Sequence, residues 1–129
     1  MALTLKQPWA TAIRELDKRV ENRTWAPPNK AVGTMIAIHA GRTFDEEGAD
    51  WVAARFGTLF ASENVPLGSI IALAKLKGSV TSSESPWFVG PYGWEFSTVI
   101  PLAPVPCRGR LHLWPVPTEV QEQIMWQLR

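Results

Sequence analysis

Residues 18–25 read KRVENRTW, a stretch in which charged or large side chains recur at every second position. A period of two is typical of a β-strand, whose successive side chains point to opposite faces. The pattern places Glu21, Arg23 and Trp25 on one face of the strand, with Lys18 in the turn just before it. We therefore expect a cation and a carboxylate to converge at this point of the fold.

The residues before this strand predict a short strand followed by a helix. Residues 3–5 suit a strand, and Pro8 suits the first turn of a helix because its missing N–H would be unpaired there. Trp9, Ile13 and Leu16 then follow at helical spacing. This spacing predicts a short helix with one apolar stripe.

Downstream of residue 25, strand-like and helix-like patterns alternate. Gly41 is expected to end the first of the downstream strands. A capping box of Thr118 and Gln121 is expected to begin the last helix. The expected elements are a strand at 35–40, a helix at 45–60, a strand at 69–76, a long loop at 81–93, strands at 95–102 and 106–114, and a helix at 118–128.

The composition indicates one domain of mixed α and β structure. The chain has 129 residues, 46% of them hydrophobic, with seven Trp and eleven Pro. Proline interrupts helix interiors and central strands, so eleven prolines imply many short elements joined by turns. We expect a single α+β domain over residues 1–129, built as a small mixed β-barrel flanked by short helices.

Charge and cysteine content exclude some classes of function. The formal net charge is only +1, which gives little support to coating of nucleic acid through bulk charge. Basic residues concentrate before residue 43, so one end of the domain is either locally positive or a mixed solvated surface. A lone Cys107 cannot form an internal disulfide, and it disfavours structural zinc. No segment reaches the roughly 18 apolar residues of a membrane span, and we expect a cytoplasmic protein without membrane or metal partners.

Five separated motifs occur in an order that resembles the ASCH domain family. They are LTLKQPWA at 3–10, KRVENRTW at 18–25, IAIHA at 36–40, PLGSIIA at 66–72 and GPYGW at 90–94. The likeness runs from about residue 3 to residue 114 and leaves only the helix at 118–128 outside it. Because that family is related to the PUA and YTH folds, the resemblance implies a PUA-like barrel.

The resemblance also implies a range of activities. Members of this family and of a close PUA-like relative bind RNA, cleave RNA, or remove acyl groups from cytidines with a lysine, a threonine nucleophile and a glutamate. The lysine carries over to Lys18, but the position three residues later is Glu21, so the threonine has no counterpart. The family usually has glycine where this chain has Leu16, a difference expected to move Lys18 relative to the cleft.

The first functional expectation is that the domain binds RNA or a modified nucleoside in a cleft. The turn at Gln7, the 18–25 strand, residues 39–42 and the loop at 87–94 are expected to form it. Base recognition needs an aromatic wall that stacks on the base and polar groups that read its edge. Trp9 and Trp51 are assigned to the core, and Gln7 and Asn22 alternatively hold backbone groups in place. The candidates are Trp25, Trp87, Tyr92 and Trp94 for the wall, and Gln7, Arg23 and Arg42 for the other contacts.

The alternative is a small hydrolase, either an amidohydrolase of acylated cytidine or a ribonuclease. In the first, Lys18 would transfer protons and Glu21 would activate water, because the nearest hydroxyl, that of Thr24, lies on the opposite strand face. In the second, Lys18 and His39 would act together with nearby arginines. No cofactor is implied, and the two histidines lack the spacing of a metal site.

Three plainer interpretations stay open. Glu21 and Arg23 form a salt bridge that only orients the strand, or His39 is a hydrogen-bonded packing residue. The aromatic cleft equally suits a protein-interaction module.

Overall fold

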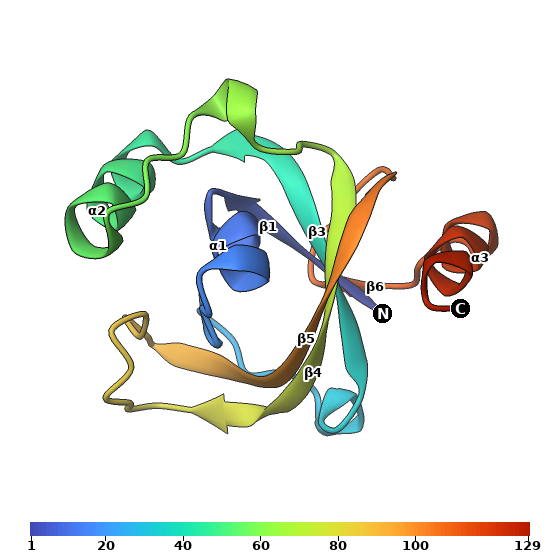
Figure 1. The fold of residues 1–129 in the computed structure, drawn as a ribbon. Helices are drawn as coiled ribbons and strands as arrows, with labels where there is room; N and C mark the ends of the chain where they lie inside the picture. The colour runs from blue at the N-terminus through green and yellow to red at the C-terminus, as the bar shows by residue number, and fades with distance from the viewer.

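The computed structural model describes residues 1–129 as a strongly curved sheet of six strands with three helices (Figure 1). The helices are α1 (Trp9–Glu15), α2 (Glu46–Phe56) and α3 (Thr118–Gln127), and two 3-10 turns, η1 (Asn29–Ala31) and η2 (Ser62–Asn64), lie in the connections. The strands are β1 (Ala2–Gln7), β2 (Val20–Arg23), β3 (Met35–Phe44), β4 (Ser69–Val80), β5 (Tyr92–Pro106) and β6 (Leu113–Trp114).

The sheet is mixed and is not closed into a barrel. Its strand order is β2-β5-β4-β3-β1-β6, with β1 and β3 parallel and every other pair antiparallel. The expected α+β class is therefore confirmed, but the edge strands β2 and β6 share no backbone pairing. Between β2 and β1 the connection is made by a side chain, because Arg23 Nη2 donates to the Thr4 carbonyl at 2.8 Å. We refer to this unpaired gap between β1 and β2 as the seam.

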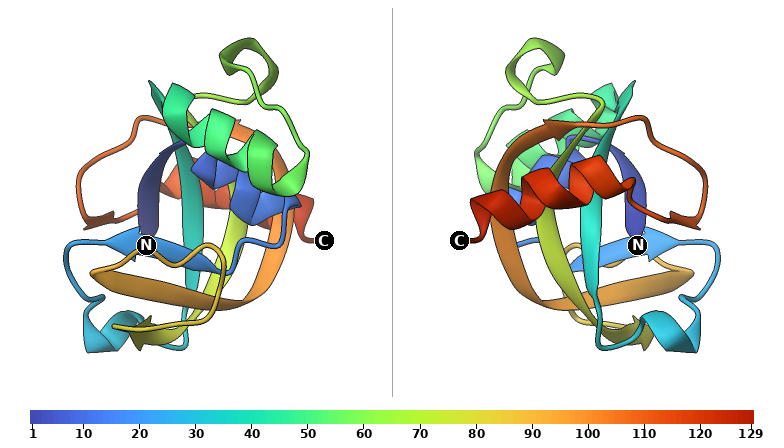
Figure 2. Two further views of the ribbon diagram at one scale, coloured as in Figure 1. Left: turned by 90° about the vertical axis from the view of Figure 1, so that its left-hand side faces the viewer. Right: turned by 90° about the vertical axis from the view of Figure 1, so that its right-hand side faces the viewer.

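Two helices pack on opposite faces of the curved sheet. Helix α1 lies inside the curve and buries Ile13 against the main core, while α3 crosses the outer face of the strands (Figure 2). Val120 and Ile124 of α3 pack there with Leu102 and Val105 of β5. Burial of these apolar side chains is the main contribution that ties both helices to the sheet.

The strands differ in length from the sequence expectation. Strand β3 continues through Gly41 to Phe44, because β1 pairs with it as far as Gln7 and Phe44. Glycine suits this position, because a Cβ at Gly41 would lie 3.0 Å from Thr4 Cγ2. The strands expected at 95–102 and 106–114 are instead the continuous β5 and the two-residue β6. Prolines are tolerated in β5 because β2 pairs only with its first four residues, and beyond them one side of the strand is a free edge.

The helix ends also show one wrong prediction. Helix α2 ends at Gly57, whose φ of 73° is left-handed, as glycine allows. The capping box expected at the start of α3 does not form, because Thr118 is already helical and makes no capping hydrogen bond. Gln121 Nε2 donates instead to the Val116 carbonyl at 2.8 Å.

Candidate functional site

A cleft opens between α1, α2, β2 and the loop of residues 81–91, which we call the covering loop. It consists of two adjoining hollows of about 450 and about 540 Å³, and both are lined by Trp9, Glu21, Asn22 and Asp45. The first hollow reaches Lys18, and the second runs along the seam. Such volumes are typical of small-molecule sites.

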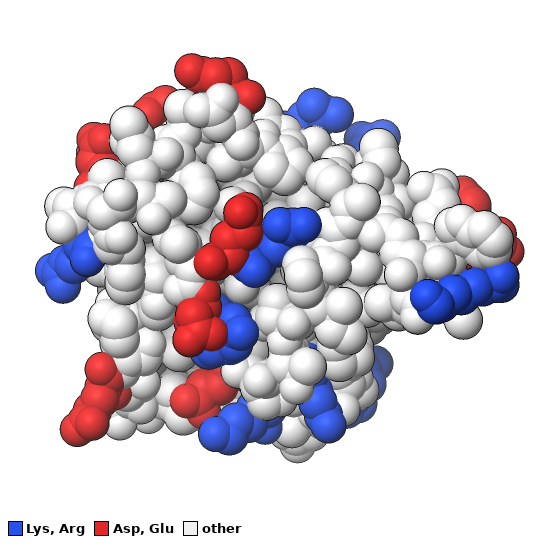
Figure 3. All heavy atoms as spheres, viewed as in Figure 1, with Lys and Arg blue, Asp and Glu red and all other residues white.

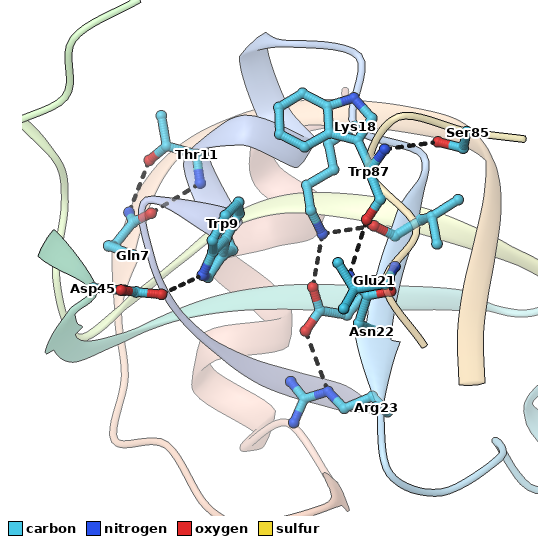
Figure 4. A network of polar contacts seen from close by, with 12 residues as sticks. Gln7, Trp9, Thr11, Lys18, Glu21, Asn22, Arg23, Asp45, Ser85 and Trp87 are labelled. Carbon is cyan, nitrogen blue, oxygen red and sulfur yellow. Dashed lines mark hydrogen bonds and ion pairs between the residues drawn. The ribbon is translucent and has the colours of Figure 1, made fainter. Parts of the chain in front are cut away.

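Lys18 forms the floor of the first hollow. It is only 1% exposed, and its Nζ donates to Glu21 Oε1 at 2.8 Å and to the Val20 carbonyl at 2.6 Å (Figure 4). The ammonium also lies 5.8 Å from the centre of the Trp9 ring. An ammonium has three N–H donors, so one donor remains for a ligand.

The turn before Lys18 works without the glycine that the resemblance would place at residue 16. Leu16 keeps negative φ, and the left-handed residue is Asp17, with a φ of 58°. Aspartate tolerates this conformation better than most residues with a side chain. The departure from the family pattern therefore does not remove Lys18 from the cleft.

Glu21 joins two cations. It is 8% exposed, and its second oxygen, Oε2, lies 3.3 Å from Arg23 Nε. Arg23 Nε makes no hydrogen bond with good geometry, so the contact with Glu21 is an ion pair only. The expected salt bridge between Glu21 and Arg23 is present, and Lys18 extends it to a chain of three charges with one net positive charge.

Three indole rings form the apolar wall of the cleft. Trp9 and Trp51 have ring centres 6.0 Å apart, and Trp51 and Trp87 have centres 5.7 Å apart. Phe56 supports Trp87 from behind in a parallel stack at 4.1 Å. Trp87 lines the cleft, as the sequence analysis expects. Trp9 and Trp51 are assigned to the core from the sequence, but in the structure they are half-buried and line the cleft.

Asp45 fixes the orientation of the Trp9 ring. Its Oδ1 accepts from Gly48 N at 2.9 Å and so caps α2, while its Oδ2 accepts from Trp9 Nε1 at 3.1 Å. The ring then lies so close to α2 that a Cβ at Gly48 would be 2.5 Å from Trp9 Cζ2. The sequence places Asp45 only at the start of the expected helix at 45–60 and gives no sign of this second contact.

Asn22 holds the covering loop over the cleft. Its Nδ2 donates to the Trp87 carbonyl at 2.9 Å, and its Oδ1 accepts from the amides of Val89 at 2.7 Å and Gly90 at 3.0 Å. The side chain thus satisfies three backbone groups that no strand or helix pairs. Asn22 therefore holds backbone groups in place, which is one of the two interpretations of its position in the sequence.

Several predicted site residues lie outside the cleft. Gln7 is fully buried and uses its amide to hold Thr11 and the Pro66 carbonyl. Trp94 is fully buried in the core, donates from Nε1 to the Trp25 carbonyl at 3.0 Å, and packs edge-on against the Trp25 ring. Tyr92 pairs with Arg23 across β5 and β2 and lines neither hollow. The sequence patterns do not show which of these aromatic residues the curvature of the sheet turns into the core.

His39 and Arg42 line a third hollow beside the cleft. Nδ1 of His39 lies 3.1 Å from Thr4 Oγ1, and its Nε2 lies 2.6 Å from the Cys107 carbonyl. Because a carbonyl only accepts, Nε2 carries the proton and Nδ1 accepts from the threonine hydroxyl. Burial lowers the pKa of His39 below its ordinary value of 6.5, against the opposing effect of the hydrogen bond to Cys107, and the nearby Arg42 lowers it further. Both ring nitrogens of His39 are thus engaged within the protein, as the packing interpretation expects.

Charges on the face around α1 are interspersed (Figure 3). Acidic side chains lie along the upper left edge, near the centre and at the lower left, and Lys and Arg are scattered among neutral residues without forming one broad basic face in this view. No group of three or more His, Cys, Asp or Glu side chains comes together as a metal site. None of the helices is long and apolar enough to cross a membrane.

The architecture is similar to that of a solved ASCH protein from Zymomonas mobilis. The two share 18% sequence identity and a TM-score of 0.60, over 97% of this chain and 92% of that chain. The chain has the ASCH fold. A serine-to-alanine mutant of the Zymomonas protein gives a TM-score of 0.58 at 17% identity, over 97% of this chain and 93% of that chain. This confirms the ASCH fold expected from the sequence motifs.

The comparison of sequences alone gave no match to a family model or to a curated protein. The likeness in structure therefore establishes the ASCH fold, and the activity has to be argued from the cleft.

Proposed function

We propose that this protein binds a nucleobase in the cleft, presented by single-stranded RNA or by a modified nucleoside. One observation carries the proposal: the indoles of Trp9, Trp51 and Trp87 surround a hollow whose floor is the buried pair of Lys18 and Glu21. Stacking of a base on an aromatic side chain contributes about 1–3 kcal/mol. A flat aromatic ligand with a polar edge fits this combination of surfaces.

The charges at the floor favour a base that presents a hydrogen-bond acceptor and a donor on the same edge. The third N–H of Lys18 would donate to a ring carbonyl, and a free lone pair of Glu21 would accept from an exocyclic amine. Cytosine presents both groups on one edge. A buried site that hydrogen-bonds both groups would reject a base lacking one of them, because its own polar group would stay unpaired.

Binding is tested by titrating the protein with cytidine, N4-acetylcytidine and a labelled hexacytidylate. Trp51→Ala removes one wall of the cleft and should weaken binding about 5- to 150-fold, the equivalent of one stacking contact. Trp126→Ala is the matched control, because that indole is 69% exposed on α3, far from the cleft. Equal affinities of the two variants, or no binding of any probe by the unmodified protein, would contradict the proposal.

The buried pair of Lys18 and Glu21 favours a second candidate, hydrolysis of an acylated cytidine. Glu21 would take a proton from water, the water oxygen would bond to the acyl carbon, and the bond to N4 would break as N4 receives a proton from Lys18. Acetate and cytidine would result from N4-acetylcytidine. Thr24 is exposed and Thr11 is held by Gln7, so neither hydroxyl is a nucleophile in this cleft.

Turnover is measured by chromatography of N4-acetylcytidine incubated with the protein, and of labelled RNA in a parallel reaction. The hydrolase predicts cytidine and acetate from the unmodified protein and none from Glu21→Gln, with binding retained. A protein that only binds gives no product from either substrate. Cleavage of RNA would have to proceed without His39, since both ring nitrogens of His39 are occupied.

A further inference from the structure

The third hollow, which we call the arginine pocket, adjoins the cleft and is strongly cationic. It has a volume of about 770 Å³, and its lining includes Arg42, Arg108 and Arg110 but no aspartate or glutamate. It shares Thr4, Gly41, Arg42 and Leu111 with the hollow along the seam, so the three hollows form one continuous groove.

The three guanidinium groups of the arginine pocket have no partner within the protein. Arg14, Arg19 and Arg23 all make hydrogen bonds or ion pairs, but Arg42, Arg108 and Arg110 make none. All three are exposed at the surface. Like charges placed together repel, and they gather at a cost unless an anion neutralises them.

The segment that carries Arg108 and Arg110 is anchored to the sheet at Cys107. It projects from the side of the molecule between β5 and β6 (Figure 2, left). Trp114 Nε1 donates to Thr4 Oγ1, the Thr4 hydroxyl donates to His39 Nδ1, and His39 Nε2 donates to the Cys107 carbonyl. This chain of hydrogen bonds anchors the segment at its first residue.

Two glycines allow the close packing of the pocket. A Cβ at Gly109 would lie 2.7 Å from His39 Cε1, so a larger residue would push the segment off its anchor. A Cβ at Gly68 would lie 2.9 Å from an Arg42 guanidinium nitrogen, and the φ of Gly68 is +63°. The Arg42 guanidinium therefore lies close to the backbone of Gly68, which a side chain at residue 68 would obstruct.

We propose that the arginine pocket binds a phosphate group of the ligand whose base occupies the cleft. This inference rests on the proposed function for the base, and it narrows the ligand to one that carries phosphate, either a nucleotide or RNA. Guanidinium groups pair with phosphate oxygens through two parallel hydrogen bonds, and the preorganised segment reduces the ordering cost of binding.

The test compares three probes on two double variants. Binding of cytidine, cytidine 5′-monophosphate and labelled hexacytidylate is measured with Arg108→Ala/Arg110→Ala. The matched control is Lys75→Ala/Lys77→Ala, which removes the same charge from exposed positions on β4 outside the groove. Because residues 108 and 110 are exposed and their guanidinium groups make no hydrogen bond or ion pair within the protein, the first variant should fold normally, which a thermal melt checks.

We expect the arginine variant to bind hexacytidylate at least tenfold more weakly, with cytidine affinity unchanged. The slope of the logarithm of the binding constant against the logarithm of the salt concentration should become shallower by about 0.7 for each phosphate that the variant no longer neutralises. A parallel weakening for cytidine 5′-monophosphate would identify a terminal phosphate, and weakening for hexacytidylate alone would identify a phosphodiester.

This experiment tests the proposal for the arginine pocket separately from the proposal for the base cleft. If hexacytidylate binding depends on the arginines but is unaffected by Trp51→Ala, the phosphate pocket stands and the base cleft fails. Wild-type affinity in the arginine variant, an equal weakening in the lysine control, or no binding of either phosphate-bearing probe would overturn the arginine pocket.

Discussion

Replacing Lys18 by methionine should lower the free energy of unfolding, because the Glu21 carboxylate then stays buried without its lysine partner. The two side chains of the pair are only 2% and 11% exposed, so water does not screen their contact at 2.8 Å. Breaking such a buried pair from one side costs about 3–5 kcal/mol. Arg23 stays 3.3 Å from the other carboxylate oxygen, so we expect the lower value, about 3 kcal/mol. For a chain of this length, that corresponds to a fall in Tm of about 11 °C.

Urea denaturation of three variants checks this value. Lys18→Met/Glu21→Leu should recover at least half of the stability that Lys18→Met removes, because no unpaired carboxylate then remains in the interior. Arg19→Met is the surface control, since the Arg19–Asp17 pair is 36% and 84% exposed and such pairs contribute about 0–1 kcal/mol. If Lys18→Met cost no more than Arg19→Met, or if the double variant recovered nothing, the assignment of a costly buried charge would be refuted.

Three further changes test the parts that shape the groove. Asn22→Ala should destabilise the protein by about 2–3 kcal/mol because it removes three hydrogen bonds, and hydrogen exchange at the amides of the covering loop should become faster. Asn22→Asp should keep the two hydrogen bonds from the amides of Val89 and Gly90 to its side-chain oxygen, and with them part of the protection from exchange. Gly48→Ala should displace the Trp9 ring and cost about 1–3 kcal/mol, seen as a shift in tryptophan emission together with a lower urea midpoint; unchanged emission would contradict the close contact. Because the pKa of His39 is lowered from 6.5, the unfolded chain takes up a proton at higher pH than the folded one, so stability should be full above pH 6.5 and fall as the pH drops below it. His39→Gln should flatten that dependence, and His112→Asn, at an exposed histidine, should leave it unchanged.

The sequence predicts local structure well wherever periodicity and charge act within a few residues. The alternation at 18–25 indicates the correct strand, the correct shared face for Glu21 and Arg23, and the convergence of Lys18 on them. It fails where the outcome depends on a neighbouring strand. Gly41 reads as a break, but β1 passes close to it and β3 continues, and the prolines of β5 are accepted because one side of that strand is unpaired.

The aromatic wall could not be assigned from spacing, because burial of an indole depends on which elements surround it. Trp9 is assigned to the core and Trp94 to the wall from the sequence, yet Trp94 is fully buried while Trp9 is half-buried and lines the cleft. What decides the place of Trp9 is its hydrogen bond to Asp45, a contact between residues 36 positions apart. Such a pairing leaves no periodic signal in one sequence.

The open seam gives a physical reason for the groove to lie where it does. Beyond Leu3, β1 pairs only with β3, and β2 pairs only with β5, so backbone groups on the facing sides of these strands have no strand partner. In a closed barrel, β1 and β2 would satisfy each other and fill the space that the second hollow occupies. Arg23 crosses the gap once, at Thr4, and leaves the rest of the seam open. Unpaired strand edges are costly to expose and readily accept new hydrogen-bond partners. We infer that the groove exists because the sheet does not close between β1 and β2. A nucleotide bound along the seam would offer hydrogen-bond partners to these strand edges, between the indoles at one end and the arginines at the other.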